Sequence, residues 1–302
     1  MKPRMVGRPC PVCGNRDEAR VFAPANFDLD ELDQFAFASR KTPEYMHLRL
    51  VVCPRCDLLY ATPIFPTGTI LSAYQEAAFA SQEEAALAAT TYGRVLDGFL
   101  GELPDLRGAL DIGTGEGAFL GELLARGFTG VVGVEPSKAP VKAAKPGIRK
   151  LIRNKPFKAG DYPKKSFSLV TCFQTLEHVT DPLKVAQAAF DLLKPGGVFF
   201  VVSHNRRALP LKLLGRKSPI FDIEHLQLFS PHSAKALFQK AGFKETRVKP
   251  VTNRYPLHYW ARLFPFPGTA KKTMLGWLKG SALGKLPLSV SGGNMMVAGF
   301  KP

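Results

Sequence analysis

Acidic residues are scarce in this 302-residue sequence, and none follows Glu245. Lysine and arginine together number 41 against 25 aspartates and glutamates, which gives a formal net charge of +16. The excess is uneven, because residues 142–165 contain nine bases and only one acid, whereas residues 1–60 are nearly neutral. Such a charge distribution favours anionic partners: nucleic acid, nucleotide-linked or phosphorylated small molecules, or an acidic membrane surface.

Long hydrophobic runs are also lacking. No apolar run approaches the ~18 residues that a membrane-spanning helix requires. The basic residues near the start are not followed by the apolar core of a signal peptide. We therefore expect a cytoplasmic protein without a membrane anchor. Hydrophobic residues at 45% and charged residues at 22% are ordinary globular values, which excludes a largely disordered chain and a fibrous repeat.

Cysteine is rare, yet four of the five cysteines fall into two short pairs. The pairs are Cys10-Pro-Val-Cys13 and Cys53-Pro-Arg-Cys56, each with the spacing of a zinc knuckle. Two knuckles supply the four soft ligands that tetrahedral Zn²⁺ prefers, so the spacing predicts a structural zinc ribbon over residues 1–65. Disulfides, unpaired thiols and an iron–sulfur cluster are the alternatives, and a reducing compartment disfavours the first. Cys172 stands alone in an apolar run and is expected to be buried.

From about residue 70 the sequence alternates short apolar runs with segments of helical periodicity. This alternation is typical of βα units around a parallel sheet. The runs predicted to be strands are 109–112, 131–134, 167–173 and 198–203. The segments predicted to be helices are 76–100, 117–126, 181–193 and 230–241. Ser or Asp followed by Pro begins the last two helices, and glycine ends several of them.

A glycine-rich loop follows the first predicted strand and opens a helix. Its sequence is Asp111-Ile-Gly113-Thr114-Gly115-Glu-Gly117, and Glu135 stands about 20 residues further on, at the end of the second strand. The glycines let the backbone approach a ligand, and the acid can accept hydrogen bonds from two ribose hydroxyls. This order of elements predicts a nucleoside-binding crevice. A dinucleotide dehydrogenase is the rival, but Asp111 would repel a pyrophosphate and attract a cationic amino acid group.

These motifs resemble those of the class I S-adenosylmethionine-dependent methyltransferases. Asp111 to Gly117 is similar to their first motif, and Glu135 to their ribose-binding acid. Phe167 to Pro182 is similar to the signature that follows their fourth strand. Lys194-Pro195-Gly196-Gly197 resembles the turn before their fifth strand, and Glu224 to Pro231 a segment found in one branch.

With the cysteine ribbon in front, the resemblance is closest to the branch that includes C-methyltransferases of nucleotide-linked deoxysugars, although the chain ends too early for their C-terminal domain. It implies a Rossmann-like α/β fold over residues 66–302, with a seven-stranded sheet in the order 3-2-1-4-5-7-6 and helices on both faces. Residues 294–300 suit the last, antiparallel strand. The methyl donor would be S-adenosyl-L-methionine. The residues expected to hold it are Asp111, Gly113, Thr114, Gly115, Gly117, Glu135, Gln174 and, beside the adenine, Asp161.

Methyl transfer from a sulfonium is an in-line displacement, and an acceptor hydroxyl or carbon acid must also lose a proton to a base. Such bases should stand at the carboxyl ends of the fourth and fifth strands. His178, Glu224 and His225 occupy these places, and the resemblance to the sugar enzymes implies that they abstract a proton. His178 could instead be structural at a helix start, and the other two could cap the next helix. Tyr74 and Tyr162 are substrate contacts or packing residues.

The expected function is methyl transfer to a small molecule, first of all a sugar or other glycoconjugate precursor that is anionic or nucleotide-linked. An RNA methyltransferase would use the ribbon and the basic surface, but the sequence has no Asn-Pro-Pro-Tyr-like motif and no catalytic cysteine pair. Natural-product O- or N-methylation and a non-catalytic binding module also remain open, as do the acceptor atom and the oligomeric state.

Residues 251–290 are expected to be an insertion before the last strand. Both tryptophans, Trp260 and Trp277, lie in it, and its charged residues are all basic. This mixture fits a segment that lies on an anionic bilayer, where each base contributes about 1 kcal/mol near the headgroups. A lid over the active site or a dimer contact is the alternative, because prolines interrupt any long amphipathic helix here.

Overall fold

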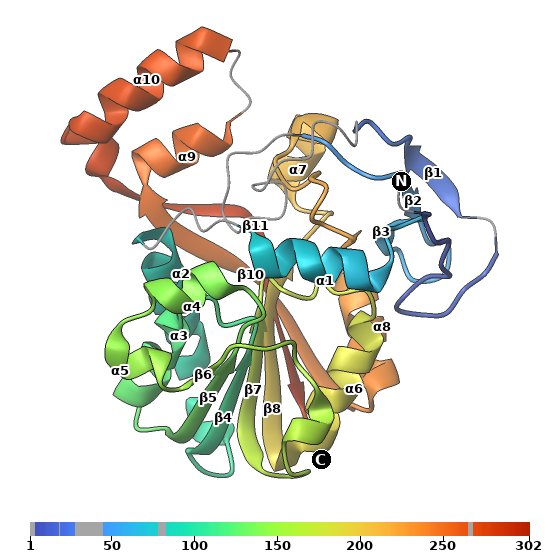
Figure 1. Cartoon of the computed structure of the whole chain (residues 1–302), viewed down its shortest axis with the longest axis vertical. Coiled ribbons are helices and arrows are strands. Elements are labelled where there is room, and N and C mark those ends of the chain that lie inside the picture. Colours follow the sequence, from blue (N-terminus) through green and yellow to red (C-terminus); the bar gives the residue numbers. More distant parts are fainter. Residues whose placement is uncertain (1–3, 18, 28–44, 78–82, 265–267) are drawn as a thin grey trace.

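The computed structural model describes the chain except for residues 1–3, 18, 28–44, 78–82 and 265–267. Part of the predicted ribbon and two prolines of the predicted insertion therefore lie outside the described residues. The chain forms a large sheet with helices around it and a smaller sheet near the N-terminus (Figure 1).

The large sheet has seven strands in the order β10-β11-β8-β7-β4-β5-β6. Their bounds are β4 Arg107–Ile112, β5 Thr129–Val134, β6 Ile152–Arg153, β7 Phe167–Phe173, β8 Leu193–His204, β10 Glu245–Pro256 and β11 Pro287–Phe300. β11 runs antiparallel to both of its neighbours, and the pairs from β8 to β6 are parallel. Read from β6, this is the predicted order 3-2-1-4-5-7-6, so the predicted fold class is confirmed.

Alternate side chains of the central strands face two helical layers. Phe199 and Val201 of β8 belong to the core beneath α6 and α8, whereas Phe200 and Val202 belong to the core beneath α2 and α3. The helices are α1 Thr67–Glu76, α2 Glu83–Asp97, α3 Ala118–Ala125, α4 Lys138–Ala143, α5 Pro146–Arg149, α6 Pro182–Leu192, α7 Leu209–Leu214, α8 Pro231–Ala241, α9 Leu257–Leu263 and α10 Gly268–Gly280. Cys172 is buried in the first core, as predicted.

Helix boundaries were predictable where caps mark them. The Asp181 side chain accepts from Lys184 N–H at 2.9 Å to begin α6, and Ser230 begins α8 with a capping box. The helix predicted over 76–100 is confirmed as α2 over Glu83–Asp97, but its predicted start is wrong, because α1 ends at Glu76 and Ala77 is extended. Residues 78–82 of the predicted helix lie outside the described residues.

The β10–β11 hairpin carries the predicted insertion. The two strands stay paired as far as Pro256 and Pro287, so the segment 251–290 begins and ends as strand. Between these points lie α9, α10 and the short helix η5 Leu283–Lys285, which project from the end of the hairpin (Figure 1).

The small sheet is shared between the N-terminal region and the rest of the chain. Three of its strands form an antiparallel meander: β1 Arg20–Ala23, β2 Leu50–Val52 and β3 Leu59–Ala61. The first cysteine pair precedes β1, and the second lies between β2 and β3. Its fourth strand, β9 Gln227–Leu228, comes from the segment between β8 and α8 and pairs with β3. The N-terminal region predicted to be a zinc ribbon is therefore joined to the part of the chain that forms the large sheet by the pairing of β3 with β9.

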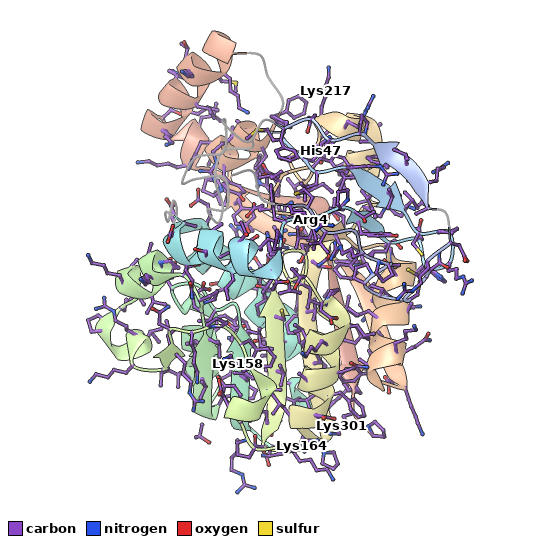
Figure 2. The ribbon with its side chains drawn as sticks, turned by 45° about the vertical axis from the view of Figure 1, so that its right-hand side comes forward. Arg4, His47, Lys158, Lys164, Lys217 and Lys301 are labelled. Atoms are coloured by element: carbon purple, nitrogen blue, oxygen red, sulfur yellow. The ribbon has the colours of Figure 1, made fainter. Side chains whose placement is uncertain are left out.

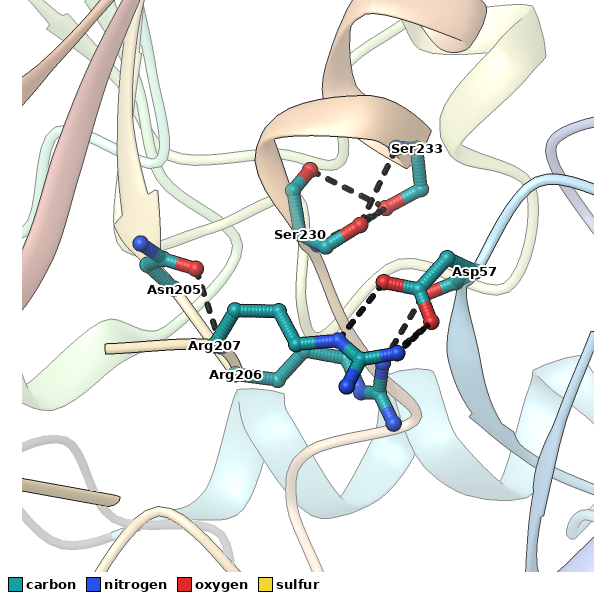
Figure 3. A network of polar contacts seen from close by, with 6 residues as sticks. All are labelled: Asp57, Asn205, Arg206, Arg207, Ser230 and Ser233. Atoms are coloured by element: carbon teal, nitrogen blue, oxygen red, sulfur yellow. Dashed lines mark hydrogen bonds and ion pairs between the residues drawn. The ribbon is translucent and has the colours of Figure 1, made fainter. Parts of the chain in front are cut away.

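Side-chain contacts reinforce this junction. Arg8 donates from Nε to the Ala61 carbonyl at 2.9 Å, from one terminal nitrogen to the Thr180 carbonyl at 3.0 Å, and from the other to the Leu226 carbonyl at 2.6 Å. The guanidinium thus spans three segments. On the opposite side Asp57 accepts from both Arg206 and Arg207, which follow β8 (Figure 3).

Arg8→Ala should lower the free energy of unfolding by about 2 to 5 kcal/mol, because three carbonyls at the junction each lose a hydrogen bond and buried unpaired acceptors cost ~1–3 kcal/mol each; the Leu226 carbonyl keeps its bond from Ala61 N–H. Urea denaturation measures this. Arg16→Ala is the matched control, since Arg16 is exposed and its loss should stay within about 0.5 kcal/mol. Equal effects of the two changes would contradict the role of Arg8.

Candidate functional site

A cavity of about 1330 Å³ lies at the carboxyl ends of β4, β5, β7 and β8. The parallel strands end at this edge, where open α/β sheets place their ligands. The loops after these strands form one wall of the cavity, and residues of α1, α2, α7 and α9 form others. The glycine-rich loop and the predicted bases line the same cavity.

The loop after β4 brings backbone to the cavity wall. Gly113 has a φ of 76°, and a Cβ atom there would overlap the Thr175 side chain, so only glycine fits. Gly115 has a φ of 57° and open space where a Cβ atom would be. Glu135 braces this loop by accepting from Gly115 N–H at 2.9 Å and from Ser137 N–H at 2.8 Å.

Two buried carboxyl groups lie at this end of the cavity. Asp111 is 3% exposed, and Oδ1 accepts from the Thr171 hydroxyl at 2.6 Å. Burial raises the pKa of Asp111 to about 6, and burial also raises the pKa of Glu135. Because burial penalises the ionised forms, a cationic ligand beside these groups would stabilise them.

Buried polar atoms without a hydrogen-bond partner in the described part of the chain also occur in the lining. Among them are Nε2 of Gln174, which follows β7, and Oδ1 of Asn253 in β10. Buried polar atoms are normally paired, so both are available to a ligand.

The structure separates the predicted donor-site residues. Asp111, Gly113, Thr114, Gly115, Glu135 and Gln174 line the cavity. Gly117, the N-cap of α3, does not line it. Asp161 also lies outside the lining and forms an ion pair with Lys155 at 2.8 Å, although its neighbours 158–160 do line the cavity.

The three predicted bases lie together in the lining of the cavity. The His178 and His225 rings have centroids 4.8 Å apart, and Glu224 Oε2 lies 3.7 Å from His178 Nδ1. Ser230, and neither Glu224 nor His225, is the N-cap of α8.

Hydrogen bonds fix the orientation of both imidazoles. His178 Nδ1 lies 2.8 Å from the Tyr74 hydroxyl oxygen and 3.1 Å from the Glu224 carbonyl oxygen. The Tyr74 hydroxyl donates to the same carbonyl at 3.2 Å. His225 Nδ1 lies 2.8 Å from the Ile220 carbonyl oxygen. Because a carbonyl oxygen only accepts, we assign the proton of each ring to Nδ1, which leaves the lone pair on Nε2.

The sequence reasoning missed a third histidine. His204 ends β8 and lines the cavity, with its ring centroid 5.2 Å from that of His225 and its Nδ1 2.9 Å from Asn294 Oδ1. Its place at the carboxyl end of the predicted fifth strand is the signal that could have found it. Tyr74 lines the cavity too, whereas Tyr162 packs between Phe157 and Phe167 outside it.

Beyond the histidines the cavity wall is mostly aromatic and aliphatic. Tyr255, Tyr259 and Trp260 form a cluster, with ring centroids 4.4 Å to 6.0 Å apart, at the base of the α9–α10 projection. All three line the cavity. This end can therefore accept an apolar or planar group.

The four paired cysteines converge at the N-terminal end of the chain. Their sulfur atoms all lie within 4.8 Å of one another, and none of the five cysteines forms a disulfide. The Sγ atoms of Cys10 and Cys56 are 3.5 Å apart, as are those of Cys13 and Cys53. Four thiolates around a tetrahedral Zn²⁺, at ~2.3 Å each, would be roughly 3.8 Å apart, so this cluster could hold a metal ion.

Within the described residues, no helix is long and apolar enough to cross a membrane.

Comparison with known proteins identifies a family to which most of the cavity-lining residues belong by their place in the sequence. Residues 79–248 match the family model described as "Methyltransferase domain". The ubiquinone biosynthesis O-methyltransferase of Paracidovorax citrulli is 31% identical over 182 residues, which cover 53% of this chain and 76% of that protein. The Shewanella pealeana protein of the same name is 33% identical over 135 residues, or 40% of this chain and 57% of that protein.

Solved structures show similarity at low identity. A SAM-dependent methyltransferase from Archaeoglobus fulgidus is 15% identical with a TM-score of 0.47, covering 70% of this chain and 94% of that one. Phosphoethanolamine N-methyltransferase 2 of Haemonchus contortus, solved with S-adenosyl-L-methionine, is 14% identical with a TM-score of 0.46 and covers 81% and 62%.

Proposed function

The chain belongs to the methyltransferase domain family and is an S-adenosylmethionine-dependent methyltransferase, and we propose that it methylates an oxygen or an acidic carbon of a small acceptor. The observation that carries this proposal is that the braced glycine loop and the histidine–glutamate cluster line one cavity. S-adenosyl-L-methionine would supply a methyl group on a cationic sulfur, and the residues of the chain must hold it and prepare the acceptor.

The donor end of the cavity fits this ligand in charge and shape. Asp111 and Glu135 are buried acids that a cationic ligand would keep ionised. Glu135 uses one hydrogen bond on each oxygen to brace the loop, and a carboxylate can accept further bonds from ribose hydroxyls. The unpaired Nε2 of Gln174 offers a donor beside them.

The base cluster supplies the proton transfer. Nε2 of His178 or of His225 would accept the proton from the acceptor hydroxyl or carbon acid, since Nδ1 is held as a donor in both rings. The Glu224 carboxylate, 3.7 Å from the His178 ring, would stabilise the imidazolium that forms. Burial raises the pKa of Tyr74 well above its ordinary value, so this hydroxyl stays protonated and keeps His178 in place.

The acceptor that we propose first is a sugar or other glycoconjugate precursor. His204, Asn253 and Asn294 line the cavity near the bases and can pair with several hydroxyl groups. A hydroxylated aromatic ring is the second candidate, because the Tyr255–Tyr259–Trp260 wall suits a planar group and because the curated relatives are named ubiquinone biosynthesis O-methyltransferases. Methyl transfer to a nucleotide-linked sugar but not to a catechol would support the first candidate, and the reverse result the second.

RNA that copurifies with the protein until high salt removes it would favour RNA as the acceptor instead.

Glu135→Ala should weaken the binding of S-adenosylhomocysteine by roughly 2 to 4 kcal/mol, because two hydrogen bonds to a charged group are lost with partial replacement by water. Isothermal calorimetry measures this. Asp161→Asn is the matched control: its carboxylate pairs with Lys155, so its affinity should stay within about twofold of the unchanged protein. A larger loss of S-adenosylhomocysteine affinity in Asp161→Asn would show that Asp161 contacts the donor, as the sequence predicted.

His178→Gln, and Glu224→Gln combined with His225→Gln, should each lower kcat by ~10²- to 10⁴-fold, the usual contribution of a general base. Donor affinity should not change, because the residues expected to hold the donor are Asp111, the glycine loop and Glu135, which these variants leave intact. His232→Gln, at an exposed position in the first turn of α8, is the control. An unchanged kcat in both active-site variants would show that His178, Glu224 and His225 do not abstract a proton.

We also propose that the cysteine cluster holds one structural zinc ion. Four sulfurs at tetrahedral spacing and the absence of disulfides support it. Such an ion would order the two knuckles next to Arg8 and Asp57, which bind the loops beside the bases.

Cys13→Ala should release about one zinc ion per chain, because three remaining thiolates bind the ion far more weakly than four. Metal analysis of the reduced protein measures this. Cys172→Ala removes a buried cysteine of β7 outside the cluster and should leave the metal content unchanged. Absence of metal from the unchanged, reduced protein would disprove the zinc site.

A further inference from the structure

Two segments beside the cavity carry exposed apolar side chains and no acid. They are residues 205–221, which contain α7, and residues 254–264 and 268–293, which contain α9, α10 and η5; together we call them the mouth surface. Ten large hydrophobic side chains are exposed among the described residues, and seven belong to the mouth surface: Leu209, Leu213, Phe264, Trp277, Leu283, Leu286 and Leu288. Single exposed apolar residues are ordinary, but such a gathering indicates an interaction site.

The cavity opens onto this surface. Leu213 is 78% exposed, Phe264 50% and Leu288 42%, yet all three also line the cavity. They therefore form its rim, with α7 on one side and the α9–α10 projection on the other. A ligand that enters the cavity passes between these apolar side chains.

Positive charge surrounds the rim. The mouth surface contains eleven bases. Arg206 and Arg207 pair with Asp57, and Arg262 pairs with Glu84. No ion pair within the described part of the chain involves the other eight, which are Lys212, Arg216, Lys217, Arg254, Lys271, Lys272, Lys279 and Lys285. Figure 2 places Lys217 at the end of the molecule that carries α9 and α10, far from Lys164 and Lys301.

Helix α10 presents both kinds of side chain outward. It packs against α9 and η5; Trp277 is 62% exposed, and Lys272 and Lys279 of the same helix are exposed too. A tryptophan flanked by lysines is suited to the boundary between lipid headgroups and acyl chains.

We propose that the mouth surface docks the protein on an anionic lipid bilayer, so that the cavity opens toward the membrane. A second copy of the chain fits the surface less well, because a symmetric contact would bring two sets of bases face to face. RNA would pair with the bases but leave the exposed leucines in water. A lipid surface matches both the bases and the apolar side chains, because anionic headgroups attract the lysines and the acyl-chain region accepts the apolar rim. This docking does not depend on which acceptor the cavity takes.

Vesicle flotation tests the proposal with the full chain. The protein should float with vesicles of phosphatidylcholine and phosphatidylglycerol, stay behind with pure phosphatidylcholine, and dissociate at high salt. The variant K271Q/K272Q/K279Q/K285Q should bind about 600-fold more weakly, at about fivefold per base. Trp277→Ser, which leaves the charge unchanged, should weaken binding by about tenfold.

A second charge variant controls for net charge. K138Q/K142Q/K145Q/K150Q removes four exposed bases on and beside α4 and α5 and should keep vesicle binding within about threefold of the unchanged protein. Unchanged affinity for S-adenosylhomocysteine in every variant shows that each is folded. Equal loss in the two quadruple variants, equal flotation with neutral vesicles, or no flotation at all would overturn the proposal. So would tighter binding to a single-stranded RNA than to the anionic vesicles.

Discussion

The buried carboxamide of Gln227 is the contact on which the acceptor end of the site depends. Its Nε2 donates to the Leu176 and Val179 carbonyls after β7, and its Oε1 accepts from Arg8 of the N-terminal region. One uncharged group thus joins the loop after β7, the segment after β8 and the ribbon. An amide suits this place because it offers donors and an acceptor without a buried charge. The loops that carry the base cluster are therefore joined by a residue outside the cluster, while the imidazoles are oriented by their own hydrogen bonds.

The donor end could be predicted from the sequence because its parts are local. Asp111, the glycine loop and Glu135 lie in one βαβ unit, where strand ends and spacing dictate which side chains meet. The sheet order followed from the family resemblance. The acceptor end was only partly predictable: the rule that bases stand at strand ends identified His178, and it applies equally to His204, one residue beyond a predicted strand, which was missed.

The remaining differences arise from contacts between distant segments. Tyr74 contacts His178 although 104 residues separate them, and no local sequence pattern near either residue predicts this contact. Asp161 was chosen as the only acid in a basic stretch, but an isolated acid among lysines is also the best local ion-pair partner, and Lys155 takes it. The end of α1 at Glu76 was missed because neither glycine nor proline follows it and the alanines that come next favour helix.

The shared small sheet has a consequence for the order of synthesis. β3 ends at residue 61, but its partner β9 begins at residue 227, so the outer edge of β3 has no mate while the intervening chain is being made. At a translation rate of 5–20 residues per second, that interval lasts roughly 10 to 30 seconds. During it the nascent ribbon presents an unpaired strand edge, the feature most prone to wrong pairing. Completion of the N-terminal region therefore waits for the ribosome to pass the segment that carries Glu224 and His225.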